Sequence, residues 1–471
     1  MNYYFLGIGG IGMSALARFF KQNGHTVSGY DHTESELTKK LVSEGIAVHY
    51  DDDPTQIPKN IDLVIYTPAV PTDTLEFQHL QKSGIPMKKR SMVLGELTRG
   101  KKCIAVAGSH GKTTTSSMIA WLLSKSESGC SAFLGGISKN FNSNVVLNAK
   151  SDYVVVEADE YDRSFLQLHP YISVITATDP DHLDIYGTHE KLLQAFEQYA
   201  NQTNPDGVLI LKEDIAEHHH EHEEEHEEGS HRPLRISEEI KQMTYSARSI
   251  EPDYYAINVR NYKGNLFFDL RTPEKVLFDM ELPESCLYNV ENAVAASAVA
   301  LQCGMDEYQL RHGLKTFKGI RRRFDFRINE KELVYIDDYA HHPKEISATI
   351  ESIKYLFPGK RVVGIFQPHL YSRTADLADE FAEALKPLDE IILMPIYPAR
   401  EKPIPGVTSH LILKKIDTMN KYLCMPSQVG ELVEALCPDV VVTMGAGDID
   451  RLVPKLEKLL REDILEEKTN E

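Results

Sequence analysis

The residues best suited to phosphate chemistry form one short glycine-rich segment, AGSHGKTTT at 107–115, directly after an apolar run. In a segment of this kind, backbone N–H groups surround phosphate oxygens, a lysine reaches the terminal phosphates and a hydroxyl binds Mg²⁺. The segment departs from the Walker pattern, because Val106 stands where the first glycine would be. The residues expected to hold ATP here are Gly108, Ser109, His110, Gly111, Lys112, Thr113 and Thr114.

Acidic residues and one histidine follow later apolar runs and could complete a metal–phosphate site. Glu157 directly ends the run at 153–156, and His182 lies in DPDHLDIYG at 179–187. An acid at a strand end beside a phosphate loop is a usual Mg²⁺ ligand, and His182 could bind a second Mg²⁺ or a phosphate oxygen. Each of these residues could instead cap a helix. Because all of them follow strands in one part of the chain, a metal–phosphate site is favoured.

A second glycine-rich turn opens the chain, where Gly7, Gly9 and Gly12 fit the pattern G-x-G-x-x-G. Missing Cβ atoms let the backbone approach a diphosphate, and the N-terminus of the following helix supplies N–H donors. Asp31 ends the next apolar run, where an acceptor for a ribose hydroxyl belongs. The pattern alone would indicate an NAD enzyme, although any nucleotide diphosphate presents the same oxyanions, and a tight turn without a ligand is the alternative.

Both turns need strands and helices to position them. Short apolar runs followed by glycine, proline or acidic residues alternate with stretches of helical spacing, as at 13–22 and 114–123. This alternation predicts α/β architecture with ligands at the carboxyl ends of buried parallel strands. The runs expected to be strands lie at 3–6, 63–66, 103–107, 153–156, 174–176, 361–366, 390–394 and 440–444.

Length and composition indicate several globular domains. The 471 residues are enough for about three domains, and 42% of them are hydrophobic. The net charge of −19 argues against nucleic-acid or anionic-membrane partners. The six cysteines form no C-x-x-C pair, and there is neither a signal peptide nor an apolar run of 18 residues. We therefore expect a reduced, cytoplasmic protein.

Much of the acidic surplus is concentrated in two places. Residues 213–239 contain 11 acidic and 2 basic residues, and residues 457–471 contain 6 acidic and 3 basic ones. The first stretch includes EHHHEHEEEHEE at 217–228, which has too few apolar residues to fold and is expected to be a solvated loop. A metal-capturing role for its histidines is the less favoured alternative.

The two nucleotide sites together point beyond a simple dehydrogenase or ATPase, and here the chain resembles the Mur ligase family of peptidoglycan synthesis along essentially its whole length. The stretches that carry the resemblance are GIGGIGMSALA (7–17), VIYTPAVP (64–71), AGSHGKTTTSSM (107–118), EADEYDRSFL (157–166), DPDHLDIYG (179–187), YNVENAVAA (288–296), IRRRFD (320–325), DDYAHHPKEI (337–346), IYPAREKPIPGV (396–407) and MGAGDI (444–449).

The resemblance implies three α/β domains and an ATP-dependent ligase. A Rossmann-like domain at 1–98 would bind a UDP-sugar, a P-loop domain with a mostly parallel sheet at 99–318 would bind ATP, and a Rossmann-like domain at 319–471 would bind the amino acid. Hinges are expected near 98–101 and 316–322. Within the family, the opening pattern GxGGxG implies UDP-N-acetylmuramate as the nucleotide and leaves two activities, addition of L-alanine or of a ready-made tripeptide. The chain length and the stretches FLQLHP (165–170), DPDHLDIYG (179–187) and IYPAREKPIPGV (396–407) favour L-alanine.

The resemblance also implies roles for individual residues. Gly7, Gly9, Gly10 and Gly12 would hold the UDP diphosphate, with Asp31 near the uridine. Lys112 and Thr113 would meet the γ-phosphate and Mg²⁺, and Glu157 and His182 would complete two metal sites. The ATP base and ribose would meet residues of the middle and third blocks, and Arg323 would contact phosphate. The residues implied for the base are Asn289 and Asn292, and those implied for the ribose are Asp337 or Asp338.

In the third block the resemblance implies a site for the incoming amino acid. Tyr339 and His341 would recognise it, His341 could alternatively accept a proton from the amine, and Arg373 would pair with its carboxylate. Position 370 is leucine and position 375 is alanine, where relatives often have arginine. Arg373 is therefore expected to act alone or with Arg400. No lysine follows closely in DPDHLDIYG, so a carbamoylated lysine is not predicted.

Two readings of a different class stay open at this level. An NAD-dependent oxidoreductase with a second nucleotide site, or a nucleotide-binding regulator, would each leave Glu157 and His182 without a use. The sequence predicts a monomer or a weak homodimer.

Overall fold

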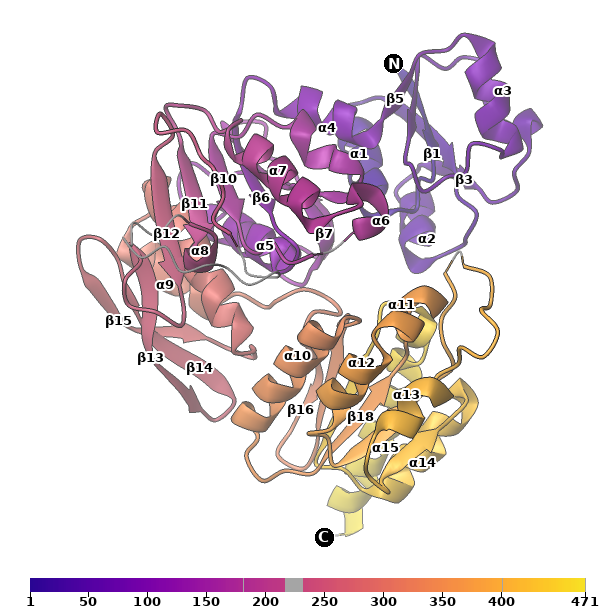
Figure 1. Ribbon diagram of the computed structural model, residues 1–471. Helices are drawn as coiled ribbons and strands as arrows, with labels where there is room; N and C mark the ends of the chain where they lie inside the picture. The colour runs from indigo at the N-terminus through magenta and orange to yellow at the C-terminus, as the bar shows by residue number, and fades with distance from the viewer. Residues whose placement is uncertain (181, 217–231, 400, 471) are drawn as a thin grey trace. The chain divides into compact units, whose positions relative to one another are not determined.

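The computed structural model describes residues 1–180, 182–216, 232–399 and 401–470, and its strands form three separate sheets. Figure 1 follows these sheets in chain order from indigo through magenta and orange to yellow. The acidic segment 217–228 lies outside the described residues, as does Arg400, so the predictions for both stay untested. No helix in the described ranges is long and apolar enough to cross a membrane.

The first sheet has five parallel strands in the order β3-β2-β1-β4-β5. Ligands of such doubly wound sheets bind where the strand order reverses, which here is the carboxyl end of β1. The glycine-rich turn follows that strand directly. The strands are β1 (Asn2–Leu6), β2 (Thr26–Tyr30), β3 (Ala47–His49), β4 (Leu63–Tyr66) and β5 (Met87–Lys89), and the helices are α1 (Ile11–Gln22), α2 (Glu36–Ser43), α3 (Leu75–Ser83) and α4 (Arg90–Thr98).

The second sheet has ten strands in the order β15-β14-β13-β12-β11-β10-β6-β9-β7-β8. Strand β6 (Lys102–Ala107) lies between β9 (Tyr153–Glu157) and β10 (Ile172–Ile175), and both pairings are parallel. Helix α5 (Lys112–Leu123) follows β6 across the phosphate loop. The other strands are β7 (Ser131–Ser138), β8 (Ser143–Val146), β11 (Val208–Lys212), β12 (Gln242–Ser246), β13 (Tyr254–Tyr262), β14 (Asn265–Arg271) and β15 (Val276–Leu282).

The helices of this middle segment pack on the sheet or carry predicted site residues. Helix α7 (His189–Ala200) is preceded by Thr188, whose side chain accepts a hydrogen bond from the Lys191 N–H, and the helix buries one apolar face. Helix α8 (Tyr288–Gln302) carries the two asparagines expected near the ATP base. The remaining elements are the 3₁₀ helices η2 (Tyr161–Gln167) and η3 (Glu213–Ile215) and the helices α6 (Leu183–Tyr186) and α9 (Glu307–Lys315).

The third sheet has six strands in the order β16-β17-β21-β18-β19-β20 and is parallel except for the β16–β17 pair. Its strands are β16 (Asp325–Asn329), β17 (Val334–Asp338), β18 (Val362–Phe366), β19 (Glu390–Leu393), β20 (Lys421–Leu423) and β21 (Val440–Met444). The helices are α10 (Pro343–Leu356), α11 (Tyr371–Asp376), α12 (Ala378–Leu385), α13 (His410–Lys415), α14 (Val429–Leu436) and α15 (Val453–Asn470), with short turns η4 (Pro426–Gln428) and η5 (Asp448–Arg451).

The cores explain why these runs are strands. Residues Ile104–Ala107 of β6 are fully buried, as expected for a parallel strand covered on both faces. Helix α1 buries Met13, Leu16, Ala17 and Phe20, a helical spacing that places them on one stripe. This stripe belongs to a core shared with residues of the middle segment such as Phe133 and Val145.

The described chain divides into two compact units. Unit 1 contains residues 1–259, 268–281 and 291–318, and unit 2 contains residues 260–267, 282–290 and 319–471. Inside unit 1, Arg18 Nη1 donates to Asn144 Oδ1 at 2.5 Å and Arg18 Nε lies 2.6 Å from Glu44 Oε2, so α1 is tied to β8 as well as to α2. The predicted α/β class with three mostly parallel sheets is confirmed, whereas the domain boundaries and hinges stay predictions.

Candidate functional site

The phosphate loop of unit 1 is built by the turn between β6 and α5. Gly111 precedes α5 with a φ of 80°, a left-handed conformation that favours glycine, and a Cβ there would also press on Asn292 Oδ1. Lys112 therefore begins the helix, and first-turn N–H groups have no acceptor within a helix. Ser109 Oγ donates to the Asp179 carbonyl at 2.7 Å, and His110 Nε2 lies 3.8 Å from Asp179 Oδ2. The loop is thus anchored to the strand end after β10.

The side chain of Lys112 is held by two acceptors. Its Nζ lies 2.6 Å from the Gly108 carbonyl oxygen and 2.7 Å from Glu160 Oε1. Burial alone would lower the pKa of Lys112, but the negative charges of Glu160, Glu157 and Asp159 outweigh burial and raise that pKa above its usual value. The predicted phosphate-binding lysine is charged, and it lies against a carboxylate.

Glu160 is the functional candidate that sequence reasoning missed. Its side chain is 1% exposed, and its Oε1 lies 3.6 Å from His182 Nε2 as well as beside Lys112. Burial opposes ionisation, yet Lys112 and the hydrogen bond with His182 bring the pKa of Glu160 down to about 2. The motif EADE at 157–160 contains three acids, and only the position of Lys112 in space singles out Glu160 among them.

Glu157 ends β9 as predicted, and its carboxylate lies over Gly135 of β7. A Cβ at position 135 would overlap both carboxylate oxygens, so the glycine provides the space for this acid. Thr113 is 7% exposed in the first turn of α5. Sequence reasoning had no means of finding Gly135, because the contact joins two strands that are far apart in the chain.

The side chains near the phosphate loop offer few ligands for Mg²⁺ by themselves. Among the described residues, no three His, Cys, Asp or Glu side chains converge as they would around a metal ion. Mg²⁺ is usually held by one or two carboxylates, with water and substrate phosphates completing its shell. Glu157 and the Thr113 hydroxyl fit this kind of shared site, which needs the nucleotide to be complete. His182 lies near Glu160, and its predicted metal role stays a prediction.

The first glycine-rich turn is shaped by backbone bonds. Gly7 has a φ of 83°, and its N–H donates to the Tyr30 carbonyl at 2.8 Å. Asp31 Oδ2 accepts the Gly9 N–H at 2.7 Å, and Asp31 Oδ1 accepts the Thr33 N–H at 3.0 Å. Asp31 therefore supports the turn itself. Its expected position near the uridine stays a prediction.

A cavity of about 230 Å³ extends from this turn to the acidic segment EADE at 157–160. The first turn of α1 forms one wall, and Gly135, Glu157 and Asp159 contribute to another. Arg90 also lines the cavity, and its Nη2 lies 3.2 Å from Asp159 Oδ2. The neighbouring Lys89 Nζ lies 2.8 Å from Asp162 Oδ2. The cavity is thus lined by the Arg90 guanidinium, by the first turn of α1 and by the carboxylates of Glu157 and Asp159.

Both predicted asparagines lie on α8. Asn292 Oδ1 accepts the Thr115 hydroxyl of α5 at 3.1 Å within unit 1. Asn289 Nδ2 donates to Ser285 Oγ at 3.1 Å within unit 2. Each is 7% exposed. Their expected role at the ATP base stays a prediction.

In unit 2 the two predicted ribose-binding acids end β17. Asp337 is 1% exposed and accepts the Thr443 hydroxyl at 2.8 Å, with Arg322 Nε 3.3 Å from its other oxygen. Burial raises the pKa of Asp337 to about 6, although Arg322 and Thr443 oppose this effect. Asp338 accepts the hydroxyls of Thr349 at 2.6 Å and Tyr288 at 3.2 Å, and burial raises its pKa.

The predicted amino-acid site forms a cluster of aromatic and basic side chains. Arg323 places its guanidinium carbon 4.7 Å from the Tyr339 ring centre, and Tyr339 meets the His341 ring edge to face at 5.3 Å. His341 in turn lies 6.1 Å from the His369 ring. His341 Nδ1 is also 3.1 Å from Glu345 Oε2.

His369 and Arg373 complete this cluster. Burial lowers the pKa of His369 to about 4, and the positive charges of His341 and Arg373 lower it further. Within the described residues, Arg373 Nη1 and His369 Nδ1 are buried without a hydrogen-bond partner. Leu370 between them has a φ of 70°, and its N–H donates to the Tyr397 carbonyl at 3.0 Å. Unused donors beside a neutral imidazole suit a small molecule that carries a carboxylate and an amine.

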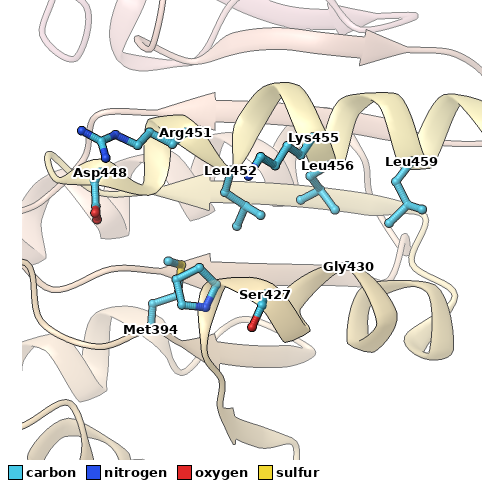
Figure 2. Close-up of a pocket in the computed structure, with 10 residues that line it drawn as sticks. Met394, Ser427, Gly430, Asp448, Arg451, Leu452, Lys455, Leu456 and Leu459 are labelled. Carbon is cyan, nitrogen blue, oxygen red and sulfur yellow. The ribbon is translucent and has the colours of Figure 1, made fainter. Parts of the chain in front are cut away.

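Another cavity lies in unit 2 and has a volume of about 580 Å³ (Figure 2). Leu452, just before α15, and Leu456 and Leu459 of α15 lie along one side of it, and Met394, Ser427 and Gly430 lie along the other. Asp448 lines it too and accepts a hydrogen bond from Gln367 Nε2 at 2.7 Å. None of the predicted site residues contributes to this cavity.

Comparison with known proteins agrees with this fold. Family models match residues 2–102 (Mur ligase family, catalytic domain), 106–300 (Mur ligase middle domain) and 322–447 (Mur ligase, glutamate ligase domain). The chain therefore belongs to the Mur ligase family.

The most similar relatives specify the class further. A UDP-N-acetylmuramate–L-alanine ligase of Parabacteroides distasonis is 47% identical, with 98% of this chain and 97% of the relative covered. A protein of the same name from Phocaeicola vulgatus is 46% identical, with 98% of each chain covered. The solved UDP-N-acetylmuramate–alanine ligase of Thermotoga maritima has a TM-score of 0.81 at 27% identity, covering 98% of this chain and all of its own. A murein peptide ligase of Psychrobacter arcticus shares the fold at 20% identity and a TM-score of 0.68, covering 98% of each chain.

Proposed function

We propose that this protein joins L-alanine to the lactyl carboxylate of UDP-N-acetylmuramate, with conversion of ATP to ADP and phosphate. The observation that supports this most directly is the cavity that runs from the first turn of α1 to Glu157. It provides N–H donors for a diphosphate at one end and a carboxylate next to the phosphate loop at the other. The relatives that cover nearly the whole chain carry the name of this activity.

The reaction needs an activated carboxylate. An oxygen of the lactyl carboxylate attacks the γ-phosphorus of ATP, the bond to ADP breaks, and an acyl phosphate forms. The neutral amine of L-alanine then attacks the acyl carbon, inorganic phosphate leaves as the amide forms, and the proton that the amine loses would pass to His341 or to the departing phosphate. The enzyme contributes mainly positioning and neutralisation of charge.

Residues of this chain can be assigned to those tasks. Lys112 and the N–H groups at the start of α5 would bind the β- and γ-phosphates, and Arg90 would neutralise charge in the sugar-nucleotide cavity. Mg²⁺ held by Glu157 and Thr113, with His182 at a second site, would offset the repulsion between the phosphates and the carboxylate. Arg323 would contact phosphate from unit 2.

The amino acid would bind at the cluster of unit 2. Arg373 would pair with the carboxylate of L-alanine, and Tyr339 and His341 would flank it. His369 has a pKa of about 4, so its imidazole is neutral near pH 7 and can accept a hydrogen bond from the amine. The proposal also includes the cytoplasm as the location and a monomer or weak homodimer as the active form.

The proposal is tested by phosphate release from purified protein. Turnover should require ATP, Mg²⁺, UDP-N-acetylmuramate and L-alanine together, and Lys112→Ala should abolish it. If phosphate release requires a murein tripeptide instead of L-alanine, the protein is a tripeptide-adding ligase. ATP turnover that ignores both acceptors, or hydride transfer to NAD, would overturn the proposal.

A further inference from the structure

Lys112 and Glu160 form an ion pair at the place where ATP is expected to bind. The Lys112 ammonium lies 2.7 Å from Glu160 Oε1, and the two side chains are 15% and 1% exposed. A terminal phosphate and a carboxylate are both anions, so they would compete for this ammonium. An ammonium has three N–H donors, and Glu160 and the Gly108 carbonyl already take two of them, so the pair has to loosen before Lys112 can bind the γ-phosphate fully.

The two partners differ in how freely they can move. The Glu160 backbone carbonyl accepts the Tyr186 hydroxyl at 2.6 Å and the Arg163 N–H at 3.0 Å, which fixes the backbone beneath the carboxylate. Within the described residues, Glu160 Oε2 is buried without a hydrogen-bond partner. Lys112 has a flexible four-carbon stem. Separation of the pair is therefore a movement of the lysine, while the carboxylate stays in place.

We propose that Glu160 is a positioning residue that holds the ammonium of Lys112 while the nucleotide site is empty and releases it to the γ-phosphate when ATP binds. This inference rests on the proposed ATP-dependent function. Without Glu160, a buried ammonium in the empty site would lose its nearest counter-charge, which is unfavourable. Glu160 therefore stabilises the empty enzyme and weakens ATP binding, because ATP has to replace it.

A structural ion pair and this role predict opposite changes in ATP affinity. Glu160→Gln keeps the shape and removes the charge, so the dissociation constant of ATP at fixed Mg²⁺ should fall about tenfold, as expected for loss of a competing charged partner. In a Lys112→Met background the same substitution should change that constant much less. The turnover number of Glu160→Gln should also fall, since Glu160 no longer draws Lys112 back from the phosphates of ADP and release of that product becomes slower.

The experiment is calorimetric titration of the full-length protein with ATP, without sugar nucleotide or alanine. Asp162→Asn is the matched control, since it removes one charge from the same loop at a residue paired with Lys89. It should leave ATP affinity unchanged. Glu160→Asp, which keeps the charge, should restore most of the wild-type constant and shows that the loop tolerates substitution.

The outcomes separate the two proposals. Weaker ATP binding by Glu160→Gln, or an equal gain in the Lys112→Met background, would overturn the positioning role of Glu160. Wild-type protein that binds no ATP would overturn the proposed function itself. Tighter binding that depends on Lys112, together with lower turnover, supports the positioning role.

Discussion

Gly135 and Glu157 are matched in space: the carboxylate of Glu157 occupies the volume that a side chain at position 135 would need. The two residues lie on β7 and β9, which pair in parallel. Glu157 also lines the cavity next to the phosphate loop, so under the proposed function its orientation would affect both the metal and the sugar nucleotide.

Gly135→Ala should therefore reduce turnover strongly. The added methyl overlaps the Glu157 carboxylate and turns it out of place, and misplacement of about 1 Å at a reacting centre costs roughly 100-fold in rate. Steady-state phosphate release measures the effect. The control is Gly24→Ala, where no atom lies within 4 Å and only a left-handed φ is strained. It should lower stability while leaving turnover intact, and equal loss of activity in both variants would contradict the assignment.

Arg373→Lys should raise the KM for L-alanine while the KM for ATP stays nearly constant. Arg373 has a buried donor available among the described residues, and removing a charged hydrogen bond costs about 1.5–3 kcal/mol, or roughly 10- to 150-fold. Initial rates over a range of alanine concentrations measure this change. Arg361→Lys, where an exposed arginine pairs with the buried Glu390, serves as the control. An unchanged KM for L-alanine would exclude Arg373 from carboxylate binding.

Because of the buried Asp337 carboxyl, the free energy of unfolding should fall as the pH rises. Burial raises its pKa to about 6 in the fold from an ordinary value of 3.8, so the native state holds the proton more tightly. The contribution is complete below pH 4 and is lost as pH rises to about 6, with a limit of about 3 kcal/mol. Urea unfolding between pH 4 and 7 should show this slope.

Two variants test whether Asp337 causes this pH dependence of the free energy of unfolding. Asp337→Asn should flatten it and raise the free energy of unfolding at pH 7, whereas Asp206→Asn on the surface should preserve it. A wild-type slope that survives in Asp337→Asn would contradict the buried carboxyl as its source.

Glu76→Gln should lower stability without a direct effect on catalysis. Glu76 is fully buried in unit 1, accepts the Tyr4 hydroxyl and lies 2.6 Å from His49 Nε2. Breaking a buried charged network costs about 1–3 kcal/mol when a partner is left unsatisfied. Chemical denaturation measures it, with the exposed Glu383→Gln as a control expected to change little. A midpoint equal to that of the wild type would show that the network is not stabilising.

The local parts of the structure were accessible from sequence. The runs at 63–66 and 440–444 are β4 and β21, and both glycine-rich turns follow strands and open helices. Glu160 could not be singled out, because its pairing with Lys112 depends on how β9 continues into the η2 loop. The Gly135–Glu157 match and the position of Arg90 depend in the same way on tertiary packing. Asp31 was found by its spacing, but its bond to Gly9 N–H is visible only in three dimensions.

The pairing of Arg90 with Asp159 has a thermodynamic consequence. Arg90 lines the cavity that we propose for the sugar nucleotide, and Asp159 is one of the acids whose charge acts on Lys112. A ligand that draws Arg90 toward itself leaves Asp159 less neutralised and changes the field at Lys112. Linkage is reciprocal, so whatever factor the sugar nucleotide imposes on ATP affinity through this pair, ATP must impose on the affinity for the sugar nucleotide.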